Sequence, residues 1–163
     1  TAGHICDIPA WAPNVEREIT SIENNIAVQT HESKFYEAVV IKLTKIEEER
    51  VDLCLLGIKK LKLKAVKIAE HEPVVGDRLY SMSAPAGIYH PPTVPILQGI
   101  YSGLMPDGKN YLSSVPAVGG SSGSAVLNEN KELVGILFAT HPAFTEISIS
   151  STLKEVKKFL KEK

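Results

Sequence analysis

The sequence predicts an all-β fold, an antiparallel barrel or sandwich followed by one C-terminal helix. Short apolar or alternating segments recur along the chain, as in strands. Turn-forming residues separate these segments, for example Gly76-Asp77 and Pro106-Asp107-Gly108. Sustained helical periodicity is found in the last segment, where Leu153, Val156, Phe159 and Leu160 share one face. Many short strands with turns between them favour this fold class over an α/β sheet.

The first half of the chain contains several candidate strands. Residues 8–18 hold Pro9, Trp11 and Pro13, which predicts a loop or one helical turn, and β texture begins at Ile19. Lysines alternate with apolar residues over 58–63, which predicts an exposed edge strand whose charges discourage pairing between molecules. The other expected elements are strands at 26–30, 36–44, 51–56 and 66–68, and a charged turn at 46–50.

The second half has clearer boundaries. Five prolines and glycines within residues 84–95 predict a loop. The polar stretch 128–131 predicts the turn of a hairpin. Ser151 or Thr152 is the expected N-cap of the final helix. The expected strands are 78–83, 96–104, 111–114, 124–127, 132–139 and 147–149.

Length and composition limit the possible functions. The 163 residues suffice for one domain with a sizeable core, and 44% hydrophobic and 23% charged residues are typical of a globular protein. The net charge of −1, with Lys and Arg scattered and no basic excess, argues against nucleic acid as a partner. No apolar run approaches the roughly 20 residues that span a bilayer, so we expect no membrane partner. Cys6 and Cys54 could form a bridge, but we favour two buried thiols and a reducing compartment, or a secreted protein that does not rely on disulfides.

The stretch from Val118 to Leu127 is the first candidate for chemistry. Glycines and serines alternate there and lead into an apolar segment, which predicts a tight loop before a buried strand. Such a loop can expose a serine while backbone N–H groups converge on one point, as acyl transfer requires. The alternative interpretation is a simple Gly/Ser turn. A nucleophilic serine would also need a base and an orienting acid.

His4 and Asp52 are the candidates for these two roles. His4, one of five histidines, lies in a run of small residues that would let its ring face an open cleft. Asp52 stands at the head of an apolar segment, where an unpaired carboxylate is costly. Taken singly, His4 could be a surface histidine near a chain end, and Asp52 could be a strand-edge carboxylate paired with a lysine.

Together these three motifs resemble those of the chymotrypsin-like (trypsin-like) serine proteases. The motifs are Thr-Ala-Gly-His4, Val-Asp52-Leu-Cys-Leu-Leu and Gly120-Ser-Ser122-Gly-Ser, in the family's order. The segment from Ser122 to Ile136 is most similar to the glutamyl-endopeptidase and HtrA-type branch. The resemblance implies that Ser122 is the nucleophile, His4 the general base and then acid, and Asp52 the residue that orients His4. It also implies an oxyanion hole formed by the backbone N–H groups of Gly120 and Ser122.

The resemblance further implies a fold of two six-stranded antiparallel β-barrels with a C-terminal helix. Residues 1–163 would form one peptidase domain. Residues 1–70 would belong to the first barrel and supply His4 and Asp52, residues 71–150 to the second barrel and supply Ser122, and residues 151–163 to the helix. In the family, strands of the first barrel precede the histidine motif, and these strands are absent here. We therefore expect the native chain to be longer.

The substrate pocket implied by the resemblance lies between the segment before Ser122 and the strand after Gly135. Neither wall contains a carboxylate, so specificity for Arg or Lys is not expected. Glutamyl endopeptidases have a histidine where this chain has Leu137, although His141 lies nearby. We predict a small or medium apolar residue before the scissile bond. The pocket residues are Pro116, Ala117, Phe138, Ala139 and Thr140.

Ser121 occupies the position where many animal members have an aspartate that pairs with a newly cut N-terminus. We therefore expect activity that does not depend on such a salt bridge. The leading hypothesis is a serine endopeptidase that acts on protein or peptide substrates without a metal or organic cofactor. The alternative is a weakly active or inactive pseudoprotease that serves as a binding module. An esterase would share the mechanism, but its usual fold is α/β and its chain order is Ser, acid, His.

Overall fold

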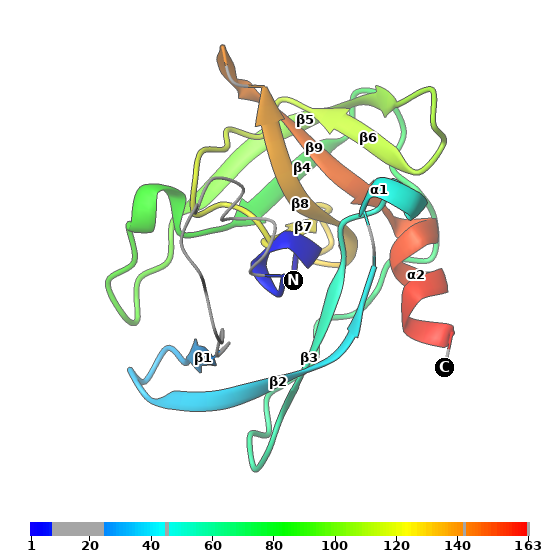
Figure 1. Ribbon diagram of the computed structural model, residues 1–163. Coiled ribbons are helices and arrows are strands. Elements are labelled where there is room, and N and C mark those ends of the chain that lie inside the picture. Colours follow the sequence, from blue (N-terminus) through cyan, green and yellow to red (C-terminus); the bar gives the residue numbers. More distant parts are fainter. Residues whose placement is uncertain (8–24, 45, 142, 163) are drawn as a thin grey trace, which may run out of the picture.

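The computed structural model describes residues 1–7, 25–44, 46–141 and 143–162. It shows a closed β-barrel, a separate three-stranded sheet and a C-terminal helix (Figure 1). The predicted loop at 8–18 and the start of β texture at Ile19 lie outside the described residues.

The second half of the chain forms the closed barrel, in which every strand is hydrogen-bonded to two neighbours. The strand order around the barrel is β4-β5-β6-β9-β8-β7, and β7 returns to β4. Closure removes the free edges that invite pairing with other chains. The strands are β4 (Arg78–Met82), β5 (Ile96–Leu104), β6 (Asn110–Ser113), β7 (Ala125–Leu127), β8 (Leu133–His141) and β9 (Phe144–Thr152).

The interior of this barrel is filled by side chains that lose almost all contact with solvent. Tyr101 and Tyr111 pack against each other with ring centroids 5.1 Å apart. Gly99 and Gly135 lie where neighbouring segments leave no room for a side chain: a Cβ on Gly99 would lie 2.2 Å from Val115 N. The buried cluster consists of Ala69, Leu79, Tyr101, Tyr111, Val115, Ala117, Val126, Val134, Leu137 and Leu153.

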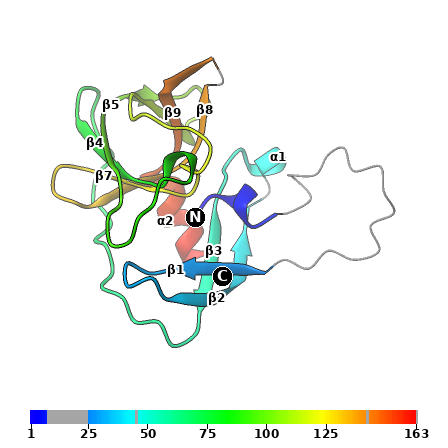
Figure 2. The same ribbon diagram turned by 90° about the vertical axis from the view of Figure 1, so that its left-hand side faces the viewer.

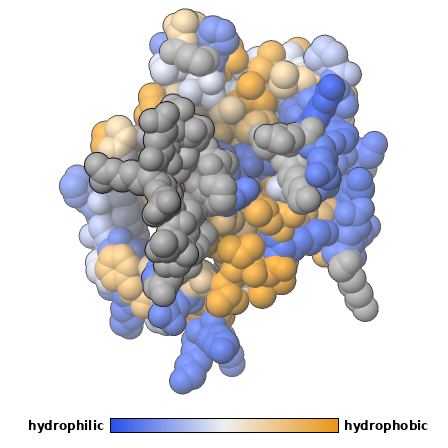
Figure 3. Space-filling view, viewed as in Figure 1, coloured by the Kyte–Doolittle hydropathy of each residue, from blue (hydrophilic) through white to orange (hydrophobic). Residues whose placement is uncertain are grey.

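The first half of the chain forms a three-stranded antiparallel sheet in the order β1-β2-β3. Its strands are β1 (Ile26–Gln29), β2 (Phe35–Leu43) and β3 (Cys54–Ile58), and a short helix α1 (Ile46–Glu49) lies between β2 and β3. Part of this sheet is open to solvent, since Val39 and Ile41 are 54% and 61% exposed. Figure 3 shows apolar atoms gathered over β2 and β3 on this face.

Helix α2 (Leu153–Lys161) joins the two halves. Thr152 caps it by accepting a hydrogen bond from Glu155 N at 3.3 Å. Its residues Val156 and Phe159 pack in one buried cluster with Val51 and Leu53, which flank Asp52. Leu133 of β8 belongs to the same cluster, so the helix fixes the Asp52 segment against the barrel.

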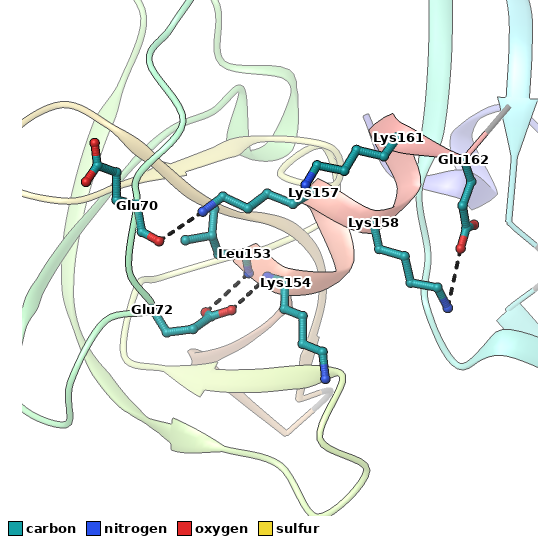
Figure 4. Close-up of a pocket in the computed structure, with 8 residues that line it drawn as sticks. All are labelled: Glu70, Glu72, Leu153, Lys154, Lys157, Lys158, Lys161 and Glu162. Carbon is teal, nitrogen blue, oxygen red and sulfur yellow. Dashed lines mark hydrogen bonds and ion pairs between the residues drawn. The ribbon is translucent and has the colours of Figure 1, made fainter.

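The connection from β3 to the barrel docks on the start of this helix. The Glu72 carboxylate accepts hydrogen bonds from Leu153 N at 3.3 Å and Lys154 N at 2.7 Å, and Lys157 Nζ donates to Glu70 O (Figure 4). These residues line a pocket of about 610 Å³ that contains none of the candidate catalytic residues. The hydrogen bonds of Glu72 and Lys157 attach the connection to the helix.

The predicted fold class is confirmed, with one closed six-stranded barrel and the C-terminal helix in place, but the described residues of the first half form a three-stranded sheet and not the six-stranded barrel that the resemblance implied. Several expected elements are wrong. The expected edge strand is absent, because residues 59–67 form no strand. The expected strand at 66–68 is a single bridge between Ile68 and Leu133. The expected charged turn is helical over residues 46–49. The connection is held by the hydrogen bonds of Glu72 and of Lys157 with Glu70 O, and by the two backbone bonds of the single bridge at Ile68. The final strand is longer than expected because its whole length pairs with β6 and β8.

The interpretation of Cys6 and Cys54 as free thiols is also wrong. The two residues form a disulfide, with Cα atoms 6.4 Å apart. Their spacing of 48 residues gave no signal for pairing. The fold brings them together because Thr1 pairs with Cys54 through two backbone hydrogen bonds, Cys54 N to Thr1 O and Thr1 N to Cys54 O.

Candidate active site

His4 lies on the short 3-10 helix η1 (Gly3–Ile5), between the barrel and the sheet (Figures 1 and 2). Its ring Nδ1 is hydrogen-bonded to Asp52 Oδ2, and its backbone N donates to Asp52 Oδ1 at 2.8 Å. One carboxylate thus holds both the ring and the main chain of His4. A carboxylate at Nδ1 keeps the proton on that nitrogen, so Nε2 is the ring nitrogen that carries none.

Asp52 is buried, with only 2% of its side chain exposed, against 27% for His4. The flanking Val51 and Leu53 side chains are also buried. Burial of a carboxylate is tolerated here because both of its oxygens accept hydrogen bonds from His4. The pair therefore presents a shielded carboxylate behind a partly open imidazole.

Thr44 holds the segment that carries Asp52, and the sequence analysis missed it. Its buried hydroxyl donates to Val51 O at 2.7 Å and accepts from Leu53 N at 2.8 Å, and its backbone N donates to Leu53 O. These bonds hold Val51 and Leu53, the residues on either side of Asp52. A threonine at the end of a strand is common, so its type and position alone gave no signal.

The need for glycine at position 3 was not predicted from the sequence either. A Cβ at this position would lie 2.6 Å from Asp52 Oδ1 and 3.2 Å from Leu53 N. Real Cβ atoms do not approach so closely, so glycine allows η1 to approach the Asp52 segment. The run of small residues before His4 was the available signal, although it was interpreted as opening a cleft.

Ser122 lies on the loop between β6 and β7. Its Oγ donates a hydrogen bond to Phe138 O on β8 at 3.2 Å. The loop is held against the same strand by two backbone bonds, Gly123 N to Leu137 O at 2.7 Å and Leu137 N to Ser124 O at 3.0 Å. The serine is therefore positioned by the barrel.

The serine loop reaches the segment that carries His4. A Cβ on Gly123, whose φ is +84°, would lie 2.0 Å from Thr1 Oγ1 and 3.0 Å from Ala2 N. Only glycine fits both this backbone conformation and this contact. The fold thus packs the loop of Ser122 against residues that precede His4 by two and three positions.

Gly120 also has a left-handed backbone, with φ of +91°. A Cβ there would lie 2.5 Å from Ala84 O. The neighbouring carbonyl of Gly119 accepts a hydrogen bond from Ala86 N at 2.7 Å, in the 3-10 turn η3 (Pro85–Gly87). These contacts fix the orientation of the peptide group that carries Gly120 N–H.

The predicted pocket residues lie on the loop between β6 and β7 and on β8. On the loop Ala117 is buried, Pro116 is half-buried, and Ala117 N donates to Thr145 O. On β8 Phe138, Ala139 and Thr140 are half-buried. Thr140 uses its hydroxyl to donate to Ile147 O at 2.8 Å. The five side chains carry no charge.

Ser121, Leu137 and His141, which bear on activation and specificity, lie at three different places in the fold. Ser121 is buried, and its Oγ accepts from Val118 N at 3.3 Å. Leu137 is part of the barrel core. His141 is exposed at the end of β8, where its Nδ1 accepts from Ala143 N.

Two negative findings concern the described residues only. Among residues 1–7, 25–44, 46–141 and 143–162, no group of three or more His, Cys, Asp or Glu side chains could hold a metal ion. No helix in the same part of the chain is long and apolar enough to cross a membrane.

Comparison with known proteins adds a family and several fold relatives. Residues 1–136 match the family described as "Trypsin-like peptidase domain". No curated protein matches the chain. Solved structures with the same fold include an inactive form of Rv3671c from M. tuberculosis (TM-score 0.70, 19% identity) and a serine endoprotease from Yersinia pestis (TM-score 0.72, 22% identity).

The alignments with these structures are extensive but partial. The Rv3671c alignment covers 84% of this chain and 69% of that chain, and the Yersinia pestis alignment covers 87% of this chain and 49% of that chain. The active form of the Rv3671c protease is similar at TM-score 0.69 and 19% identity, with 85% of this chain and 63% of that chain covered.

Proposed function

Because the chain belongs to the trypsin-like peptidase family, we propose that it is a serine endopeptidase that hydrolyses peptide bonds through an acyl-enzyme intermediate. The observation that carries this proposal is the pairing of His4 with the buried Asp52, next to the loop of Ser122. Its substrates are proteins or peptides. The chemistry requires neither a metal nor an organic cofactor.

In this mechanism Ser122 Oγ attacks the scissile carbonyl, and His4 Nε2 takes its proton. To do so, the hydroxyl must donate to His4 in place of Phe138 O, its present acceptor. Asp52 keeps the Nδ1 proton of His4 in place and stabilises the imidazolium that forms. His4 then passes the proton to the departing amine, and water hydrolyses the acyl-enzyme by the same route.

The oxyanion of the tetrahedral intermediate would be bound by Gly120 N–H and Ser122 N–H. The fixed peptide between Gly119 and Gly120 supports this role, because a donor aligned in advance needs no reorganisation during the reaction. Removal of one such donor costs about 2.7–4 kcal/mol of transition-state stabilisation. Gly120 is thus required for its backbone and not for a side chain.

The uncharged walls support a preference for a small or medium apolar residue before the scissile bond. Neither wall offers a carboxylate to an Arg or Lys side chain, and the buried Leu137 offers no cation to a Glu side chain. A peptide library digested with the purified chain should be cut mainly after residues such as Ala or Val. Cleavage mainly after Arg, Lys or Glu would contradict this specificity.

A fluorophosphonate probe, which reacts with activated serines, tests the mechanism itself. We expect the wild-type chain to be labelled, Ser122→Ala not to be labelled, and His4→Ala to be labelled far more slowly. Ser124→Ala is the matched control, since it removes a hydroxyl from the same loop and should leave labelling unchanged. A folded wild-type chain without labelling would instead indicate a binding module of the same fold.

A further inference from the structure

The Cys6–Cys54 disulfide connects the two segments that carry the candidate base and acid. Cys6 follows His4 by two residues, and Cys54 follows Asp52 by two residues. The covalent link therefore runs beside the His4–Asp52 pair. Both cysteines are buried, so the bridge is enclosed by the same part of the fold.

The 3-10 turn that carries His4 is attached to the Asp52 segment by several hydrogen bonds. Thr1 pairs with Cys54 through two backbone bonds, and His4 N donates to Asp52 Oδ1. Within η1 one bond, Cys6 N to Gly3 O at 2.8 Å, closes the turn. A single 3-10 turn is not stable by itself, so its position depends on what ties it to neighbouring segments.

The nucleophile and the pocket walls are held differently. Residues 138–140 lie in the closed barrel, and backbone hydrogen bonds hold the loop of Ser122 against β8. No cysteine lies in that half of the sequence. Loss of the disulfide should therefore disturb the base and its orienting acid and leave the nucleophile loop and the pocket in place.

We propose that Cys6 and Cys54 are positioning residues whose disulfide sets the geometry of His4 and Asp52, so that the chain is fully active only in an oxidising compartment. This inference rests on the proposed protease function. Activation is a thiol–disulfide exchange: the Cys6 and Cys54 thiols react with an external disulfide RSSR to give the Cys6–Cys54 bond and two RSH. Secreted and periplasmic compartments supply such oxidants, whereas the cytosol keeps thiols reduced.

The direct test compares the oxidised chain, the same chain after reduction with a dithiol, and the Cys6→Ser/Cys54→Ser double variant. Intact mass confirms the redox state of each. We expect kcat on a peptide substrate to fall about 10²-fold in the reduced chain and the double variant, as displacement of a catalytic group by about 1 Å can cause. KM should change little, because the pocket walls lie in the barrel. Added dithiol should not affect the double variant.

A second measurement separates positioning from general destabilisation. The His4 Nδ1 proton bound to Asp52 should give a strongly deshielded proton NMR signal in the oxidised chain. The signal should broaden or vanish after reduction and in the double variant. Leu153→Ala is the control: it removes a buried side chain from the barrel core and keeps the disulfide, so the folded variant should retain the signal and the wild-type kcat.

Each outcome decides one of the two ideas. Wild-type kcat and an unchanged His4 signal in the folded double variant would overturn the positioning role and leave the protease function intact. An oxidised wild type with neither turnover nor probe labelling would refute the protease function, and the NMR comparison would still decide the positioning role. A fall in kcat of equal size in Leu153→Ala would also overturn the inference, because the effect would then reflect stability alone.

Discussion

The barrel and the three-stranded sheet hold their candidate catalytic residues by different means. In the barrel, each strand is paired on both sides and the interior is closed to solvent, so the Ser122 loop rests on a continuous hydrogen-bonded framework. In the sheet, β1 and β3 are the outer strands, and Val39 and Ile41 stay more than half exposed. There, His4 and Asp52 are held by a disulfide, the Thr44 hydroxyl and helix α2. A site shared by two such regions depends on the few contacts that join them.

The largest expected effect tests whether the two regions act as one catalytic unit. Asp52→Asn should lower kcat/KM by about 10⁴-fold, because the amide favours the wrong tautomer of His4. The Ser122→Ala variant should lose still more, and the double variant should be no worse than Ser122→Ala alone. Steady-state kinetics of the three proteins provide the measurement. Effects that multiply in the double variant would show that Asp52 and Ser122 act independently.

The next effect compares packing in the two regions. Leu79→Ala removes a fully buried side chain from the barrel and should cost about 2–5 kcal/mol of unfolding free energy. Val39→Ala on the exposed face of the sheet should change it by less than about 0.5 kcal/mol. Urea unfolding followed by circular dichroism measures both. Equal losses would mean that the sheet face is as tightly packed as the barrel.

A smaller effect concerns the start of the helix that joins the regions. Thr152→Ala removes the side chain that accepts from Glu155 N and should cost about 0.5–2 kcal/mol. Thr152→Ser retains an oxygen at the same place and is the matched control. Thermal melts of the three proteins give the comparison. A Ser variant as unstable as the Ala variant would assign the loss to the missing methyl group instead of the cap.

The smallest effect concerns the exposed ion pair between the connection and β8. Lys67 Nζ lies 2.7 Å from Glu132 Oε1, and this bond, together with that from Asn128, holds the pKa of the Glu132 carboxyl below its ordinary value. A lowered folded-state pKa stabilises the protein above the unfolded value of about 4.3, and the gain is lost as pH falls through the folded value. Glu132→Gln should therefore melt slightly below wild type at pH 7, and the difference should narrow at about pH 3. A constant difference at both pH values would contradict this account.

Much of the barrel could be predicted from sequence because its strands alternate clearly and are separated by proline and glycine. His4, Asp52 and Ser122 were singled out as candidates because each stands in an unusual local context and because the three motifs follow the family's order. The structure pairs His4 with Asp52 and places Gly123 against Thr1, a contact that the motifs did not predict, and the catalytic roles of the three residues stay predictions.

What could not be predicted depends on contacts between distant segments. The disulfide depends on the pairing of Thr1 with Cys54. The hydrogen bonds between Thr44 and residues 51–53 depend on the chain reversal through α1, which brings these residues together. The lysines of 59–64 suggested an edge strand by alternation alone, but the chain there leaves the sheet to reach the helix. Local periodicity carries no information about such long-range attachments.

Helix α2 has a consequence for the order in which the molecule matures during synthesis. The ribosome makes Val156 and Phe159 after all the described strands, yet these side chains complete the buried cluster around Val51 and Leu53. A nascent chain that already contains His4, Asp52 and Ser122 still has this cluster open. The packing that encloses the Asp52 segment is completed only when the helix has emerged, which delays the mature site until the barrel has been translated.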